Sequence, residues 1–262
     1  MTVVSLFEPT SADRLEASDV ALFLDLDGTL VEVEDSPADV QADSACIDLL
    51  RRARDRLSGR LAVLSGRPVM EVDSILQGAV NDVAGVHGLQ MRTARWGLVA
   101  EPAHPAVAEA AAVFDDFAAA DAGLLVERKG HSVALHYRLA PGAGEAVIEF
   151  TQRLASETGL AVQHGSMVAE LRTPGPDKGA ALSRLMGHPP FSGARPIMIG
   201  DDLTDEAAFV EAQLRGGIGV RVGAERPTAA VGRLDEPRSV LSWIDRSLSS
   251  GVFDLEDAQW GG

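Results

Sequence analysis

Short apolar runs without polar alternation recur in both halves of the chain. They are Val20–Leu24, L-A-V-L at 61–64, D-V-A-G-V at 82–86, P-I-M-I-G at 196–200 and G-I-G-V-R-V at 217–222. Runs of this length are typical of strands buried on both faces of a parallel sheet. Between them, apolar residues recur at helical spacing, first in a helix that we expect Ser36-Pro37 to open and Gly59 to end. Alternating strands and helices predict a doubly wound α/β sheet, Rossmann-like in type.

The pattern changes between residues 103 and 173. An Ala-rich helix at about 105–119 precedes two alternating strands, G-L-L-V-E-R-K and S-V-A-L-H-Y-R, which predict a hairpin. A helix at about 145–157 and two further alternating strands follow. Alternation is typical of a sheet with one solvated face. We therefore expect an α/β core from residues 1–102 and 174–262, and an inserted α+β cap domain at 103–173.

The two ends of the chain give weaker signals. Residues 1–19 read as a loose leader, and G-I-G-V-R-V reads as the last strand. One amphipathic helix is expected from about Pro237, followed by an acidic end that carries no interpretable pattern.

Composition limits the classes of partner. Lys and Arg number 23 against 39 Asp and Glu, a formal charge of -16, so nucleic acid and anionic membranes are not expected to bind. The single Cys46 cannot form an internal disulfide, and we interpret it as a core residue in a reducing cytoplasm. The sequence has no signal-peptide pattern and no apolar stretch near the ~20 residues of a membrane span. These features favour a cytoplasmic protein that acts on small molecules.

The segment A-L-F-L-D-L-D-G-T-L at 21–30 carries the strongest chemical signal. Asp25 and Asp27 follow a buried strand directly, at the edge where open α/β sheets bind ligands. Two carboxylates at a strand end can hold a divalent cation, and one of them can act as a nucleophile. An Asp-Gly turn without chemistry is the alternative interpretation.

Three further features lie at the ends of predicted core strands or at helix starts. Ser65 follows L-A-V-L, Lys178 begins a helix, and G-D-D-L-T-D-E at 200–206 follows P-I-M-I. Each has an ordinary structural interpretation: a turn serine, a solvated lysine, and a helix start with acids near its positive end. Together they offer a hydroxyl donor, a positive charge and the hard oxygen ligands Asp201 and Asp205, which suit Mg²⁺.

These four motifs, in this order, resemble the haloacid dehalogenase superfamily of phosphotransferases. The resemblance implies a covalent aspartyl-phosphate mechanism with Asp25 as nucleophile and Asp27 as general acid and base. It also implies that Thr29 and Ser65 bind the transferring phosphoryl group, while Lys178 stabilises its anionic oxygens.

The same resemblance implies a bound Mg²⁺. Its ligands would be the Asp25 carboxylate, the Asp27 backbone carbonyl and Asp201, with Asp205 and Asp202 steadying its waters. Electrostatics also requires cations at such a site, because a carboxylate nucleophile is repelled by a phosphate dianion unless positive charge neutralises the site.

The cap carries motifs of a narrower family. E-R-K-G-H-S-V-A-L-H-Y-R at 127–138 and M-V-A-E-L-R-T-P-G-P-D-K-G at 167–179, with S-G-R-P and V-H-G, resemble trehalose-6-phosphate phosphatases over about 21–248. The resemblance implies hydrolysis of a small sugar phosphate, trehalose 6-phosphate. It also implies a stand-alone phosphatase, with a separate trehalose-6-phosphate synthase in the pathway.

Several polar residues are candidates for binding the sugar. In the cap they are Glu127, Lys129, His131 and Glu170, and at core strand ends they are Arg67 and His87. A surface ion pair is the alternative for Glu127 and Lys129, and His136 is interpreted as structural.

Two alternative functions stay open. One is a phosphatase of the same fold acting on sucrose phosphate or mannosyl-phosphoglycerate. The other is a catalytically silent regulatory subunit of a trehalose synthase complex, against which the full set of motif residues argues.

Overall fold

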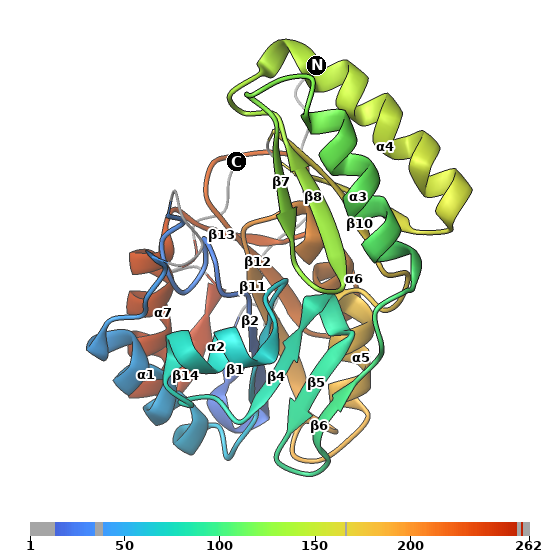
Figure 1. Ribbon diagram of the computed structural model, residues 1–262. Helices are drawn as coiled ribbons and strands as arrows, with labels where there is room; N and C mark the ends of the chain where they lie inside the picture. Colours follow the sequence, from blue (N-terminus) through green and yellow to red (C-terminus); the bar gives the residue numbers. More distant parts are fainter. Residues whose placement is uncertain (1–13, 35–38, 166, 256–257, 259–262) are drawn as a thin grey trace, which may run out of the picture. The chain divides into compact units, whose positions relative to one another are not determined.

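The computed structural model describes residues 14–34, 39–165, 167–255 and 258. The chain forms two compact units (Figure 1). Unit 1 comprises Met1–Ala100 and Pro176–Gly262, and unit 2 comprises Glu101–Gly175. Each unit is described separately below.

Unit 1 is built on an eight-stranded sheet in the order β13-β12-β11-β2-β3-β4-β5-β6. Its parallel strands are β2 (Val20–Leu24), β3 (Leu61–Leu64), β4 (Asp82–Gly85), β11 (Arg195–Gly200), β12 (Ile218–Val222) and β13 (Gly232–Leu234). β2 lies between β11 and β3, with Leu24 paired to Ile199 and to Val63. The segments that follow β2 and β11 therefore leave the sheet side by side, at its carboxyl edge.

Helices cover both faces of this sheet. Alternate strand residues such as Leu22, Val63 and Ile199 pack with α1 (Ser44–Arg56), α2 (Val69–Leu76) and α7 (Pro237–Ser250). The other strand residues, including Phe23 and Met198, pack with α5 (Lys178–Met186) and α6 (Glu206–Leu214). Burial on both faces explains why these strands read as uninterrupted apolar runs. The doubly wound α/β architecture is thus confirmed.

The sheet has more strands than the sequence predicted. β5 (Gln90–Thr93) and β6 (Gly97–Ala100) add an antiparallel hairpin at one edge, so the sheet is mixed rather than wholly parallel. G-I-G-V-R-V is not the last strand, because β13 and then β14 (Val252–Asp254) follow it. These strands are only three or four residues long, too short for a clear pattern.

The predicted leader and the first helix also need correction. Residues 14–16 form β1 (Arg14–Glu16), which pairs with β14, so the segment up to residue 19 is not wholly loose; residues 1–13 lie outside the described part. The expected helix start at Ser36-Pro37 also lies outside it. The helix begins at Ser44, where the Asp43 side chain accepts a hydrogen bond from Cys46 N at 2.7 Å.

Unit 2 is a four-stranded antiparallel sheet with helices on one face. The strand order is β7-β8-β10-β9, from Leu125–Arg128, Ser132–His136, Val168–Arg172 and Ala161–Gly165. Helices α3 (Ala106–Ala118) and α4 (Gly144–Thr158) lie against this sheet (Figure 1). Their apolar residues pack with Val133, Leu135, Ala169 and Leu171. The alternate residues of the same strands face the other way, which is the cause of the alternation read from the sequence.

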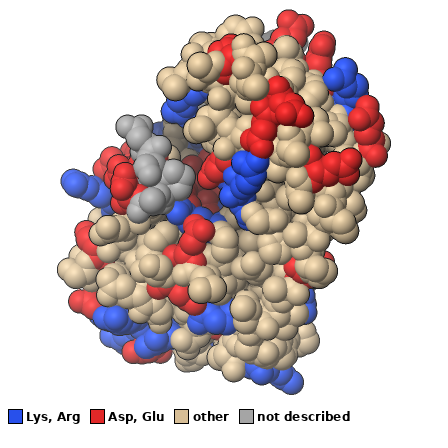
Figure 2. Space-filling model, viewed as in Figure 1, with Lys and Arg blue, Asp and Glu red and all other residues tan. Residues whose placement is uncertain are grey.

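No helix within the described residues combines the length and apolarity that a membrane crossing requires. On the face drawn in Figure 2, acidic and basic side chains are interspersed.

Candidate active site

The site is centred on Asp25, the first residue after β2. Its backbone N–H donates to Ile199 O on the neighbouring strand β11 at 2.9 Å, so the pairing of the two strands continues up to the site. Asp201 is the first residue after the β11 end at Gly200. Two adjacent parallel strands therefore deliver two carboxylates to one place, as expected for the carboxyl edge of such a sheet.

Lys178 brings a positive charge into this group from the other side. It is the first residue of α5, whose N-terminus is capped by Asp177 accepting from Ala180 N at 2.8 Å. The Lys178 Nζ lies 2.8 Å from Asp25 Oδ1 and 2.7 Å from Asp205 Oδ1. The side chains of Lys178 and Asp205 are almost fully buried, so little water screens these contacts.

Asp205 also shapes the loop after β11. Its Oδ2 accepts from the Asp202 backbone N–H at 2.9 Å, and the Asp202 side chain caps the same turn in return. Gly200 makes room for it, because a Cβ at that position would lie 2.3 Å from the Asp205 Cγ. The G-D-D-L-T-D-E motif is thus both the start of a helix and the loop that carries Asp201 and Asp205.

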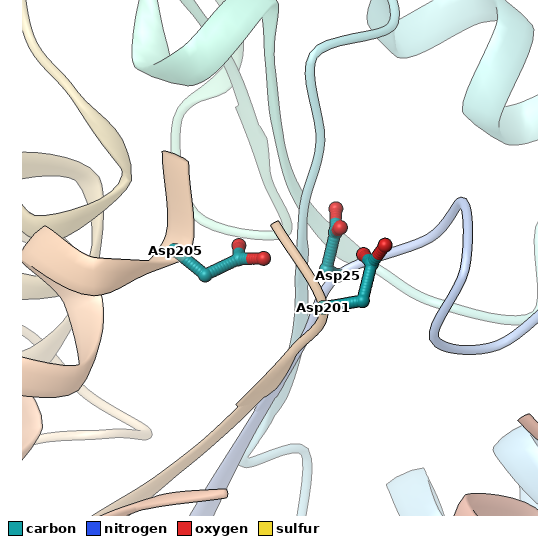
Figure 3. Close-up of side chains that lie close together, drawn as sticks. All are labelled: Asp25, Asp201 and Asp205. Carbon is teal, nitrogen blue, oxygen red and sulfur yellow. The ribbon is translucent and has the colours of Figure 1, made fainter. Parts of the chain in front are cut away.

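The three carboxylates Asp25, Asp201 and Asp205 form a cluster. One oxygen from each lies within 4.8 Å of the others, and Figure 3 shows the side chains converging. Lys178 neutralises only one of the three charges. The Asp201 Oδ1 atom is buried and has no hydrogen-bond partner within the described residues. Excess negative charge and an unpaired carboxylate oxygen fit a hard divalent cation.

Burial and mutual repulsion perturb the acids. Burial, and then the charge of Asp205, hold the pKa of Asp25 well above its usual range. The same two causes raise the pKa of Asp201 to about 6. Burial opposes the charged form of Lys178, but the carboxylates of Asp205 and Asp25 outweigh it and raise its pKa. An additional cation in the cluster would favour the ionised carboxylates.

Gly28 lets the motif loop fold back against Asp201. Its φ is +77°, and a Cβ there would lie 2.4 Å from the Asp201 Oδ2. The turn is closed by Gly28 N donating to Val31 O at 2.8 Å. Glycine is therefore required both by backbone conformation and by the close approach of the carboxylate.

Asp27 stands apart from the carboxylate cluster and binds Arg67. The Arg67 Nε donates to Asp27 Oδ2 at 2.8 Å, and its Nη2 donates to Oδ1 at 2.7 Å. This two-bond contact fixes the orientation of the Asp27 carboxylate. The sequence assigned Arg67 to the sugar and gave no sign of the pair, because 40 residues separate its members.

The other core candidates surround the same strand ends. Thr29 is buried, and its Oγ1 has no hydrogen-bond partner within the described residues. Ser65 is buried directly after β3, and its Oγ accepts from Arg67 N at 3.1 Å, which leaves its hydroxyl hydrogen to donate. His87 adopts a φ of 54°, donates its N–H to Ser65 O at 3.0 Å, and places its ring against Gly66.

A second polar group lies in unit 2. The Lys129 Nζ lies 3.1 Å from Glu170 Oε2 and 3.5 Å from Glu127 Oε2. Both acids flank Ala134 in register, Glu127 on β7 and Glu170 on β10. The ion pair that was the alternative interpretation of Glu127 and Lys129 is thus present, as part of a larger network.

His136 belongs to this network, whereas His131 is held differently. The His136 ring lies 2.9 Å from Glu127 Oε2, and this hydrogen bond is the main cause that lowers the pKa of Glu127. The strand pattern placed His136 among structural residues and gave no sign of the contact. The His131 Nε2 lies 2.9 Å from the backbone oxygen of Glu101, beside the β7–β8 turn.

Comparisons with known proteins identify relatives of the chain. The trehalose-phosphatase family model matches residues 23–238. The trehalose-6-phosphate phosphatase of Escherichia coli is 33% identical over 240 residues, covering 91% of this chain and 90% of that protein.

Two solved structures resemble the chain in fold. The crystal structure of a trehalose-6-phosphate phosphatase related protein has a TM-score of 0.70 at 25% identity, covering 88% of this chain and 98% of that one. A haloacid dehalogenase-like hydrolase from Bacteroides thetaiotaomicron has a TM-score of 0.61 at 19% identity, over 87% and 98% of the two chains, and so shares the fold.

The contacts of Lys178 predict a stability change. In metal-free buffer, Lys178→Met should lower the free energy of unfolding by about 3–5 kcal/mol, because two buried carboxylates lose their ammonium partner. Adding Asp205→Asn should recover part of that loss, so the double variant loses less than the sum of the two single variants. The measurement is urea unfolding followed by tryptophan fluorescence, since Trp96 and Trp243, the tryptophans among the described residues, both belong to unit 1.

Arg52→Met serves as the control for this experiment. It removes an exposed ion pair with Asp245 in the same unit and should cost less than about 1 kcal/mol. If Lys178→Met behaves like Arg52→Met, the buried ion pairs do not hold the site together.

Proposed function

Because the chain belongs to the trehalose-phosphatase family, we propose that it hydrolyses trehalose 6-phosphate to trehalose and inorganic phosphate. The observation that carries the proposal is a single carboxylate, Asp25, held 2.8 Å from Lys178 beside two further acids. This arrangement suits attack on a phosphate ester, which is governed by positioning and charge neutralisation. The family relatives act on the same substrate by name, which supports the choice of sugar.

The proposed reaction has two steps. An Asp25 oxygen attacks phosphorus, the bond from phosphorus to the sugar oxygen breaks, and Asp27 gives a proton to that oxygen. Water then attacks the phosphorus of the aspartyl phosphate while Asp27 takes back a proton, so inorganic phosphate leaves and both carboxyl groups are restored. Asp27 gives its proton to the sugar oxygen in the first step and takes one from the attacking water in the second, so it returns to its protonated state.

Arg67 acts in this scheme as a positioning residue. Its two hydrogen bonds hold both oxygens of Asp27, so the carboxyl group is aligned before the substrate arrives. One of those oxygens must be released for Asp27 to reach the sugar oxygen. The side chain of Asp27 is one-third exposed, which leaves it accessible from solvent.

Thr29, Ser65 and Lys178 are proposed to bind the phosphoryl oxygens. The unpaired Thr29 hydroxyl and the available Ser65 hydrogen are donors, and the Lys178 ammonium offsets the negative charge. A phosphate oxygen would thus supply the hydrogen-bond acceptor that the Thr29 hydroxyl lacks among the described residues.

We propose Mg²⁺ as the cofactor. Asp25, Asp201 and Asp205 provide hard oxygen ligands, and the Asp27 backbone carbonyl is the fourth candidate. When bound, the ion neutralises negative charge on the phosphate and the carboxylates. The same cation would offset the negative charge of the three carboxylates that Lys178 alone does not neutralise.

Unit 2 is proposed as the cap that recognises the sugar. Lys129, Glu127 and Glu170 present paired donors and acceptors on one face of the sheet, which suits the hydroxyl groups of a disaccharide. His131, Arg67 and His87 remain proposed contacts. A separate synthase would supply the substrate, and a reducing cytoplasm suits the lone buried thiol of Cys46.

Metal dependence tests the proposed chemistry. Phosphate release from trehalose 6-phosphate should stop in excess chelator, return with Mg²⁺ and fail to return with Ca²⁺, whose looser coordination misplaces the reacting oxygens. Asp201→Asn should weaken Mg²⁺ binding, measured by calorimetry, by about tenfold or more, whereas the exposed control Asp55→Asn should not.

The substrate panel for this test includes sucrose 6-phosphate and mannosyl-phosphoglycerate. Full activity in chelator would rule out the cation. Faster release of phosphate from another member of the panel would overturn the choice of trehalose 6-phosphate.

The cap assignment predicts a loss that depends on the substrate. Lys129→Ala or Glu170→Ala should lower kcat/KM for trehalose 6-phosphate by about tenfold or more, the effect of one lost hydrogen bond to a charged group. A small aryl phosphate lacks the distal sugar, so its hydrolysis should be nearly unchanged.

The neighbouring Arg128→Ala is the matched control, because Arg128 is exposed and pairs with Asp115. It should leave both substrates unaffected. Equal losses on both substrates in Lys129→Ala would show that Lys129 maintains the fold and does not read the sugar.

A further inference from the structure

Arg221 is a buried cation in the middle of β12. It is 5% exposed and pairs in register with Gly200 of β11 on one side and Arg233 of β13 on the other. Residues two apart on a strand share a face, and a Cβ at Gly219 would lie 2.7 Å from the Phe209 Cβ. Arg221 therefore lies on the α6 side of the sheet, beside Arg233.

Each of these two arginines has one buried N–H donor that lacks a hydrogen-bond acceptor. The Nε atoms of Arg221 and Arg233 are both buried and have no hydrogen-bond partner within the described residues. No ion pair of Arg221 occurs there either. Burial, and then the charges of Arg226 and Arg233, lower the pKa of Arg221. A buried guanidinium Nε–H group without an acceptor is costly, because it loses hydration and gains no hydrogen bond in return.

The nearby acids are already engaged. The Glu206 carboxylate accepts from Arg226 Nη1 at 2.6 Å, from Thr228 Oγ1 at 2.9 Å and from Ala229 N at 2.7 Å. Asp235 accepts from Arg233 Nη2 at 3.0 Å. The local positive charge thus exceeds what these carboxylates neutralise, in a chain whose overall charge is -16.

We propose that Arg221 and Arg233 form a second anion site, which binds a small inorganic oxyanion such as phosphate or sulfate. One tetrahedral oxyanion can accept from both unpaired Nε atoms and neutralise two adjacent guanidinium groups. Arg226 adds positive charge and anchors the neighbouring loop, since its Nη2 donates to Asp201 O at 3.3 Å.

The site has a surface side and a buried side. The Arg233 side chain is 29% exposed on β13, the edge strand of the sheet, which offers an anion a route to it. Because Arg221 is almost completely covered, the innermost position suits an inorganic anion and excludes an organic phosphate ester. The site is distinct from the carboxylate cluster, although the backbone oxygen of Asp201 accepts from Arg226 and the Asp201 charge also acts on Arg221.

The test measures thermal stability in chelator, with chloride buffers matched in ionic strength to buffers containing sulfate or inorganic phosphate. An anion that binds the folded state raises Tm. Wild type should gain Tm in both oxyanions, and Arg221→Met should lose most of this gain. In chloride alone, Arg221→Met should be as stable as wild type or more so, because an unpaired buried charge is gone.

Two further variants and one further anion complete the design. Arg233→Met should also lose the increase in Tm that the oxyanions cause. If Arg221→Met does not fold, Arg233→Met is compared with wild type in its place. The exposed control Arg52→Met should keep the increase. Wild type and all three variants retain the catalytic cluster, so any oxyanion that binds at that cluster changes the Tm of each of them equally. Equal oxyanion gains in wild type and both site variants would overturn the proposal. An Arg221-dependent gain with glycerol 3-phosphate larger than that with inorganic phosphate would overturn the commitment to an inorganic ion.

Discussion

The buried contacts of Lys178 with Asp25 and Asp205 join the parts of unit 1 that carry its chemistry. One ammonium contacts the residue after β2 and the turn that begins α6, at 2.8 and 2.7 Å. Because these groups are shielded from water, losing one of them leaves a buried charge without a partner. The constraint fixes where α5 begins relative to the strand ends. It also leaves the cluster with more negative charge than Lys178 can neutralise.

The backbone around this cluster packs tightly against the carboxylates. Gly28 and Gly200 bring the chain so close to Asp201 and Asp205 that no Cβ fits at either position. The same crowding raises the pKa of Asp25 and Asp201, after burial itself. Perturbed acids of this kind are concentrated at functional sites. Arg221 shows the opposite imbalance, an excess of positive charge on a neighbouring strand.

Much of the fold follows from local patterns, whereas several contacts do not. Apolar runs located the central strands, because burial on both faces leaves a clear signal in the sequence. The short strands β1 and β14 lack such a signal, and their pairing joins segments more than 230 residues apart. The pair of Arg67 with Asp27 depends on side-chain geometry that spacing does not encode. The acids of the cluster were found because each directly follows a strand or begins a helix.

Chemical trapping of Asp25 tests the central claim most directly. Borohydride reduces an acyl phosphate to an alcohol but leaves a free carboxylate unchanged, so it marks a carboxyl group that has become phosphorylated. If it is added during turnover of trehalose 6-phosphate, mass spectrometry of the peptides should find homoserine at position 25 and no other modified acid. The modification should be absent without substrate. Steady release of phosphate with Asp25 unmodified, or with the mark on another carboxyl group, would contradict the account.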